Sequence, residues 1–145
     1  MLWKIYSIVA AAIFCLTLCA VRDILQKQIY ISEIIAFALI NLILAWYEKI
    51  GWGAMVFGVL PGIVLFLVSV CSREKMGKGD AFLVMGAGIY LGIVKIFLVV
   101  FAALLLSSVY GLFLLWKKKG WAYEIAFVPF LLVPYTGAVI LSFFS

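Results

Sequence analysis

The sequence predicts an all-α membrane protein, a bundle of six transmembrane helices forming one domain over residues 1–145. Hydrophobic residues make up 69% of the chain and charged residues only 12%. A soluble domain of this length would need a larger polar shell. The apolar residues form long stretches separated by short polar segments, and about 20 apolar residues are enough to cross a bilayer.

The predicted spans cover residues 2–21, 29–47, 53–71 and 122–144, with two more within 81–116. The stretch 81–116 contains a single charge, Lys95, and as one helix it would be about 54 Å long, which is too long for one crossing. We therefore expect the chain to fold back near residues 92–95. Gly88 and Gly92 have the four-residue spacing that lets helices approach closely, so we interpret them as packing residues.

The first span also has features of a secretory signal peptide. Its apolar core is longer than such a peptide needs, and another apolar span follows it, so we expect it to be retained.

Basic residues set the expected orientation. The segments after the first, third and fifth spans hold eight of the 11 Lys and Arg residues, namely Arg22, Lys27, Arg73, Lys75, Lys78, Lys117, Lys118 and Lys119. The other side holds Lys4, Lys49 and Lys95. Because cytoplasmic loops are enriched in Lys and Arg, the larger set is predicted to lie in the cytoplasm of a cell-membrane protein, with both termini outside.

Composition also argues against some kinds of site. The chain has no histidine, and its three cysteines form no Cys-x-x-Cys pair, so neither a metal site nor another cofactor is expected. The net charge is +5, but the basic residues are dispersed among the loops instead of gathered on one face. Nucleic-acid binding is therefore not expected.

A short polar segment before the fourth span contains the clearest motif. Residues 77–80 read Gly-Lys-Gly-Asp, so Gly77 and Gly79 precede Asp80 at the start of an apolar run. This Gly-x-Gly-Asp form occurs in one class of membrane aspartyl proteases. It does not fit a phosphate-binding loop, because glycine, not Ser or Thr, follows the lysine.

A catalytic carboxylate of this kind needs a partner, and Asp23 is the candidate. It lies in the polar segment 22–28, which the charge count places on the same side of the membrane as Asp80. Taken alone, Asp23 is better explained as a solvated loop residue or a helix cap than as a catalytic residue. Glu33 and Asn41 lie inside the second span, Glu33 about one turn from its polar end.

Two adjacent carboxylates favour a state in which one is protonated and the other is charged. The charged one takes a proton from water, which attacks a peptide carbonyl, while the other protonates the carbonyl oxygen. The small glycines before Asp80 would let a substrate backbone come close. The sequence leaves open which aspartate holds the proton and whether the pair is assembled before substrate arrives.

These features together resemble the type IV prepilin peptidase family. The resemblance rests on Asp23 followed by Lys27, on the Gly-Lys-Gly-Asp motif at 77–80 continuing to Gly86 and Gly92, and on the Pro-Phe-containing segment 125–131. It implies a six-helix membrane aspartyl endopeptidase that cleaves the basic leader of prepilins or pseudopilins at the cytoplasmic surface. Asp23 and Asp80 would be its catalytic dyad, and Gly77 and Gly79 its motif glycines.

The resemblance also bears on whether the protein methylates the new amino terminus after cleavage. Larger members carry an amino-terminal cytoplasmic insertion with paired cysteines that accompanies N-methylation, and this chain lacks it, so cleavage without methylation is expected. Its small size is similar to the peptidases of tight-adherence (Flp) pili and to archaeal preflagellin peptidases.

Two departures from the family pattern bear on the substrate. Tyr30 and Ile31 replace the usual Pro-Asn, and Phe82 replaces a frequent lysine. Two alternatives remain at this point: a small transport or channel protein lined by Asp23, Glu33 and Asp80, and a non-catalytic pilus-assembly subunit.

Overall fold

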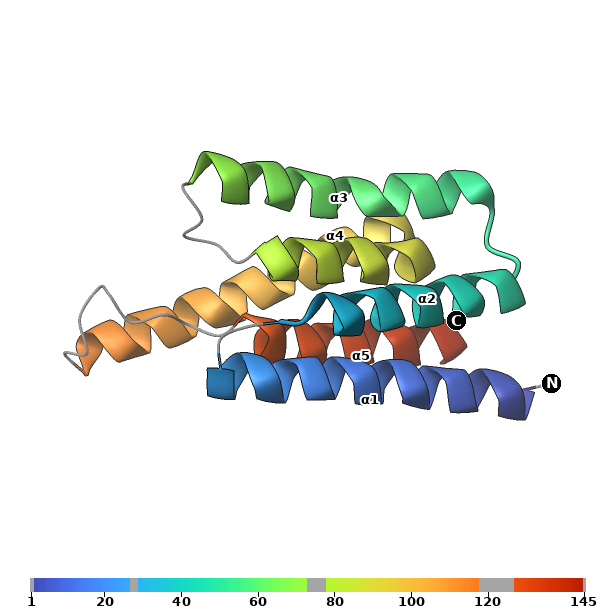
Figure 1. Cartoon of the computed structure of the whole chain (residues 1–145), viewed down its shortest axis with the longest axis horizontal. Helices are drawn as coiled ribbons and strands as arrows, with labels where there is room; N and C mark the ends of the chain where they lie inside the picture. The colour runs from blue at the N-terminus through green and yellow to red at the C-terminus, as the bar shows by residue number, and fades with distance from the viewer. Residues whose placement is uncertain (1, 27–28, 73–77, 118–126, 145) are drawn as a thin grey trace.

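The computed structural model describes residues 2–26, 29–72, 78–117 and 127–144. These residues form five helices that lie roughly alongside one another: α1 (Leu2–Gln26), α2 (Ile31–Tyr47), α3 (Trp52–Cys71), α4 (Lys78–Trp116) and α5 (Val128–Phe144) (Figure 1). The predicted all-α class is confirmed. Helices α1, α3 and α4 are each long and apolar enough to cross a membrane, whereas α2 and α5 are apolar helices of 17 residues.

Helix α4 is two helical segments joined at a sharp bend. The backbone of Gly92 has φ 76° and ψ 172°, a conformation outside the helical region. Figure 1 shows the chain reversing direction at this bend, so the two segments of α4 run back along each other. The predicted reversal near residues 92–95 is therefore confirmed, and a glycine makes it because other residues rarely adopt this backbone conformation.

Glycines also bring α3 and α4 into backbone contact. A Cβ atom on Gly58 of α3 would overlap the carbonyl oxygen of Gly88 on α4, and the converse holds for Gly88. One turn further along α3, Gly62 faces the backbone of Met85 in the same way. The predicted packing role of Gly88 is thus confirmed. Gly92 also takes part in this contact, since its Cα would lie 3.1 Å from a Cβ atom on Gly58, although nothing lies within 4 Å of its own Cβ position.

Two predicted element boundaries are corrected by the structure. Helix α1 does not end near residue 21 but continues to Gln26, so Asp23 lies in a helix and not in a polar loop. Helix α5 begins at Val128, whereas the predicted span began at 122, and residues 122–126 lie outside the described ranges. Pro129 fits the first turn of this helix, where the missing N–H of proline has no helical partner to lose.

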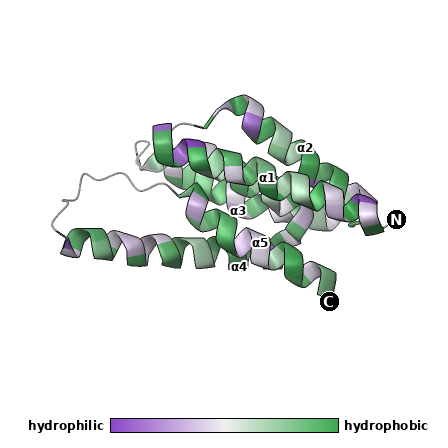
Figure 2. Ribbon diagram, turned by 90° about the horizontal axis from the view of Figure 1, so that it is seen from below, coloured by the Kyte–Doolittle hydropathy of each residue, from purple (hydrophilic) through white to green (hydrophobic). Residues whose placement is uncertain are grey.

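The arrangement gathers several helix ends at one end of the bundle. The end of α1 and the starts of α2, α4 and α5 lie toward one side in Figure 1, and both chain termini lie at the other. Hydrophobic colour covers most of the length of the helices in Figure 2, while hydrophilic residues concentrate toward their ends. Large apolar side chains such as Trp3 and Phe144 are more than four-fifths exposed, as expected for a surface that faces lipid.

Candidate active site

Asp23 is positioned by the last turns of α1. Its exposed fraction is 8%, although it stands only three residues from the end of that helix. Its neighbours on the inward face include Cys19 and Ala20, which are also buried. The helical extension of α1 past residue 21 is therefore what turns this carboxylate into the bundle.

Asp80 is positioned by the first turn of α4. It is the third residue of that helix and, like Asp23, has an exposed fraction of 8%. Its Oδ1 atom is buried and has no hydrogen-bond partner in the described part of the chain. A buried polar atom without a partner is costly in a folded protein and often marks a functional position.

The structure brings the two aspartates together. The carboxyl groups of Asp23 and Asp80 lie close enough to interact electrostatically, although 56 intervening residues separate them in the chain. They come from different helices, α1 and α4, that meet at the same end of the bundle (Figure 1). The pair that the sequence predicted therefore shares one buried site.

A third helix contributes a backbone donor to this site. The backbone N–H of Val128, the first residue of α5, donates a hydrogen bond to Oδ2 of Asp23 at 3.2 Å. The first N–H groups of a helix have no partner within it and favour an anion. Next in the chain, Pro129 has no N–H, and the N–H groups of Phe130 and Leu131 both turn back to the carbonyl oxygen of Phe127.

Of the two motif glycines, the structure describes Gly79, while Gly77 lies outside the described residues. A Cβ atom on Gly79 would come within 3.2 Å of the side chain of Ile29, which precedes α2. Gly79 therefore lets the start of α4 approach the segment that leads into α2. This close contact is with the protein itself, which adds a packing role to the predicted one.

Arg22 and Glu33 form an ion pair beside Asp23. Arg22 Nε and Glu33 Oε1 are 2.9 Å apart, and the Arg22 guanidinium also lies over the Tyr30 ring, 5.0 Å from its centroid. Glu33 thus ties α2 to the end of α1 and is not an isolated charge in a span. The other departure from the family pattern, Phe82, packs its ring against Phe66 of α3 at 5.4 Å.

The described residues contain no cluster of three or more His, Cys, Asp or Glu side chains able to hold a metal ion. Of the free cysteines, Cys19 is buried, Cys15 is half-buried and Cys71 is exposed. Cys15 contacts the carbonyl oxygen of Glu33 at 3.8 Å, consistent with the predicted packing role.

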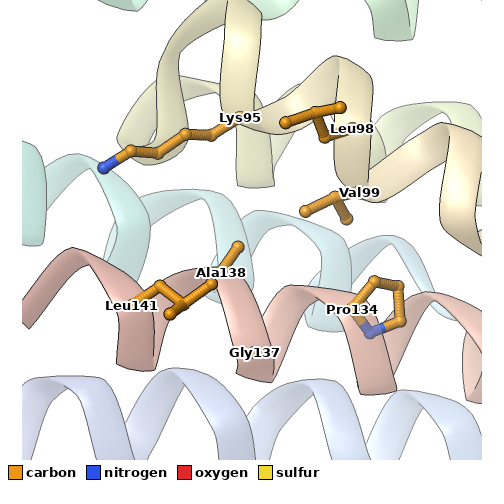
Figure 3. A pocket seen from close by; sticks show the side chains of 7 residues that line it. All are labelled: Lys95, Leu98, Val99, Pro134, Gly137, Ala138 and Leu141. Atoms are coloured by element: carbon orange, nitrogen blue, oxygen red, sulfur yellow. The ribbon is translucent and has the colours of Figure 1, made fainter. Parts of the chain in front are cut away.

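A cavity of about 430 Å³ lies away from the aspartates, between α5 and the second segment of α4 (Figure 3). Its lining is apolar apart from Lys95, whose Nζ donates to the Ser142 hydroxyl at 2.8 Å. It offers no carboxylate for acid–base chemistry, so the buried aspartate pair remains the candidate active site.

The Val128 N–H is the site component that sequence reasoning missed. The segment 125–131 carries part of the family resemblance, but the resemblance gives it no role in the site. Pro129 was the available signal, because a proline early in an apolar run indicates a helix start, and a helix start presents free N–H groups.

These features define an all-α protein with three candidate membrane spans and two buried aspartates at one end of the bundle. One comparison with known proteins identifies a family. The model of the type IV leader peptidase family matches residues 10–112, more than half of the chain and a range that includes both aspartates. The chain therefore belongs to the type IV leader peptidase family. No curated protein and no solved structure matched it.

Proposed function

We propose that the chain is a membrane aspartyl endopeptidase that removes the leader peptide of type IV prepilins or pseudopilins. Membership of the family implies prepilin peptidase activity. The observation that carries the proposal is the pair formed by Asp23 and Asp80, two buried carboxyl groups from separate helices within electrostatic reach of one another. Isolated buried carboxylates are costly, whereas a pair that shares a proton suits hydrolysis of a peptide bond.

The proposed reaction needs only these two side chains and water. One aspartate, ionised, takes a proton from a water molecule as the water oxygen bonds to the peptide carbonyl carbon. The other, protonated, gives its proton to the carbonyl oxygen. The C–N bond then breaks as the first aspartate protonates the leaving amine, and the second recovers a proton from the tetrahedral intermediate.

The proposal also covers the class of prepilin that is cleaved and whether the new amino terminus is methylated. We expect pseudopilins or Flp-type prepilins as substrates and cleavage without N-methylation. The cysteines support the second expectation, because Cys15, Cys19 and Cys71 form no Cys-x-x-Cys pair.

The topological part of the proposal places the dyad at the cytoplasmic surface of the cell membrane. The two segments of α4 would each cross the bilayer, which makes six crossings in one domain over residues 1–145. Both termini would then lie outside. The distribution of Lys and Arg supports this orientation.

The test is processing of a prepilin in cells that have no other prepilin peptidase. A Flp-type prepilin and a pseudopilin would each be coexpressed with the wild-type chain, with Asp23→Asn and with Asp80→Asn. We expect mature pilin with the wild-type chain and none with either variant, because each carboxylate carries one half of the proton transfer.

Glu48→Gln is the matched control, since Glu48 is an acidic residue whose Oε1 accepts a hydrogen bond from Tyr90 in another part of the bundle. It should process the prepilin like the wild-type chain. Processing that persists in both aspartate variants would overturn the proposal. Prepilin binding without cleavage by the wild-type chain would favour an assembly subunit, and ion flux in vesicles without cleavage would favour a channel.

A further inference from the structure

Asp23 and Asp80 are equally buried but differ in what their oxygens contact. Oδ2 of Asp23 accepts the backbone N–H of Val128, whereas Oδ1 of Asp80 is buried without a hydrogen-bond partner among the described residues. A hydrogen bond donated to a carboxylate stabilises its charged form, and burial without a donor disfavours that form. The two members of the pair are therefore not equivalent.

We propose that the N-terminus of α5 assigns the roles in the dyad: the Val128 N–H holds Asp23 as the ionised base, and Asp80 carries the proton. The inference rests on the proposed peptidase function and goes further by naming which aspartate activates water. In the steps described above, Asp23 takes the water proton and later gives it to the amine. Asp80 protonates the carbonyl oxygen and is then reprotonated by the intermediate.

The local sequence of α5 suits this positioning role. Val128 is the first helical residue and Phe127 precedes it as the last residue outside the helix. Pro129 offers no N–H, and the next two N–H groups bond to the Phe127 carbonyl, so Val128 supplies the donor that reaches Asp23. The electropositive end of the helix adds to the effect of the hydrogen bond.

The helices that contribute to this end of the bundle also carry other charged and titratable groups. On α1 they are Arg22 and Cys19, on α2 Glu33, and on α4 Asp80 itself with Lys78 two residues before it. Arg22 Nε lies 2.9 Å from Glu33 Oε1, so Glu33 balances the positive charge of Arg22. No titratable residue occurs in the first turn of α5, Val128 to Leu131.

Nuclear magnetic resonance on the full chain tests the assignment directly, because Asp23 and Asp80 are the only two aspartates in the sequence. The Asp80→Asn and Asp23→Asn variants would each be labelled with ¹³C at the aspartate side-chain carboxyl, placed in lipid bilayers and titrated with acid. Each variant reports one aspartate without the charge of the other. We expect Asp23 to titrate at a lower pH than Asp80, and the reverse order or equal values would overturn the inference.

Val128→Pro then tests the hydrogen bond itself, since proline is well tolerated at the first helical position but has no N–H. In the Asp80→Asn background it should raise the titration midpoint of Asp23 by about one pH unit, the amount expected for one hydrogen bond to a charged group. Val128→Ala keeps the N–H and removes the side chain, so it should leave the midpoint in place. An equal midpoint in both variants would contradict the role of the N–H.

Kinetics with both aspartates present separate this inference from the proposed function. The probe is a peptide with a basic leader, a glycine at the cleavage site and an apolar segment after it. Val128→Pro should move only the acid limb of the kcat/KM profile, to higher pH, because that limb reports ionisation of the first aspartate. Movement of the alkaline limb alone would show that Asp23 holds the proton. A wild-type chain that cleaves no prepilin would refute the peptidase function, while the NMR order would still decide the assignment.

Discussion

At the scale of single residues, polar groups inside this bundle are few, and each described one has a definite setting. Asn41 is fully buried in α2, where its Nδ2 donates to the Phe37 carbonyl at 2.9 Å. Its Oδ1 accepts the Tyr135 hydroxyl of α5 at 2.8 Å, so the pair joins two helices by a side-chain hydrogen bond. Among the described residues, Glu33 Oε2 and Asp80 Oδ1 are buried without a hydrogen-bond partner, but Glu33 is ion-paired with Arg22 through its other oxygen. We interpret the hydrogen-bonded Asn41–Tyr135 pair and the ion-paired Glu33 as structural, and Asp80 as functional.

Tyr135→Phe tests the structural interpretation. It leaves the buried Oδ1 of Asn41 without its donor, which should lower the free energy of unfolding by about 1–2 kcal/mol. The measurement is the Tm of the purified protein in detergent, followed by tryptophan fluorescence. Tyr6→Phe is the control, because Tyr6 is exposed and only its ring contact with Phe143 is involved. Equal Tm values for the two variants would contradict the interpretation.

At the scale of elements, glycines perform three different tasks. Gly58 and Gly88 allow α3 and α4 to touch, Gly92 bends α4, and Gly79 admits Ile29 next to the aspartate pair. The sequence alone predicted close packing at Gly88 and a reversal near residues 92–95. It could not separate the two tasks, because glycine spacing is the same whether a residue faces a neighbouring helix or takes a backbone conformation reserved for glycine.

Alanine substitutions distinguish these tasks. Gly58→Ala should cost about 1–3 kcal/mol through overpacking against Gly88. Gly92→Ala should cost a similar amount, about 1–3 kcal/mol, through backbone strain, although space is available for the methyl group. Gly137→Ala is the matched control in α5, with nothing within 4 Å and an ordinary helical backbone, and it should leave Tm unchanged or raise it. Loss of stability at Gly137 but not at Gly58 would contradict the described packing.

The sequence predicts those parts of the candidate site that are side chains, but not the part that is a backbone group. Asp23 and Asp80 were identifiable because charged residues are rare in so apolar a chain and the charge count placed both on one side. The Val128 donor was not identifiable in the same way, since it is a backbone group and its value depends on where α5 begins and what it faces. The end of α1 was predicted five residues too early, at 21 and not at Gln26, because hydropathy falls where the helix itself continues.

At the scale of the whole molecule, the helices place the aspartates and both termini at opposite ends of the bundle (Figure 1). The distribution of Lys and Arg predicts that the aspartate end faces the cytoplasm. Cys71, exposed at the end of α3 just before the segment that leads to Asp80, is a natural reporter for the dyad end.

A membrane-impermeant thiol reagent applied to intact cells checks the orientation. In a Cys15→Ala, Cys19→Ala background, Cys71 should be protected in intact cells and labelled once the cells are opened. Gly51→Cys with Cys71→Ser is the opposite reporter, placed in the turn between α2 and α3, where nothing lies within 4 Å of the Cβ position. It should be labelled in intact cells. The reverse pattern would place the dyad outside.

The account as a whole depends on Asp23 and Asp80 acting as one unit on a peptide bond. The most direct measurement is kcat/KM for prepilin cleavage by Asp23→Asn, Asp80→Asn and the double variant, each shown by its Tm to be folded. In each single variant kcat/KM should fall at least about 100-fold. In the double variant it should fall no further than in the worse single variant, because either substitution alone already abolishes the joint action of the two carboxyl groups. Wild-type cleavage by either single variant, or losses that multiply in the double variant, would contradict the account.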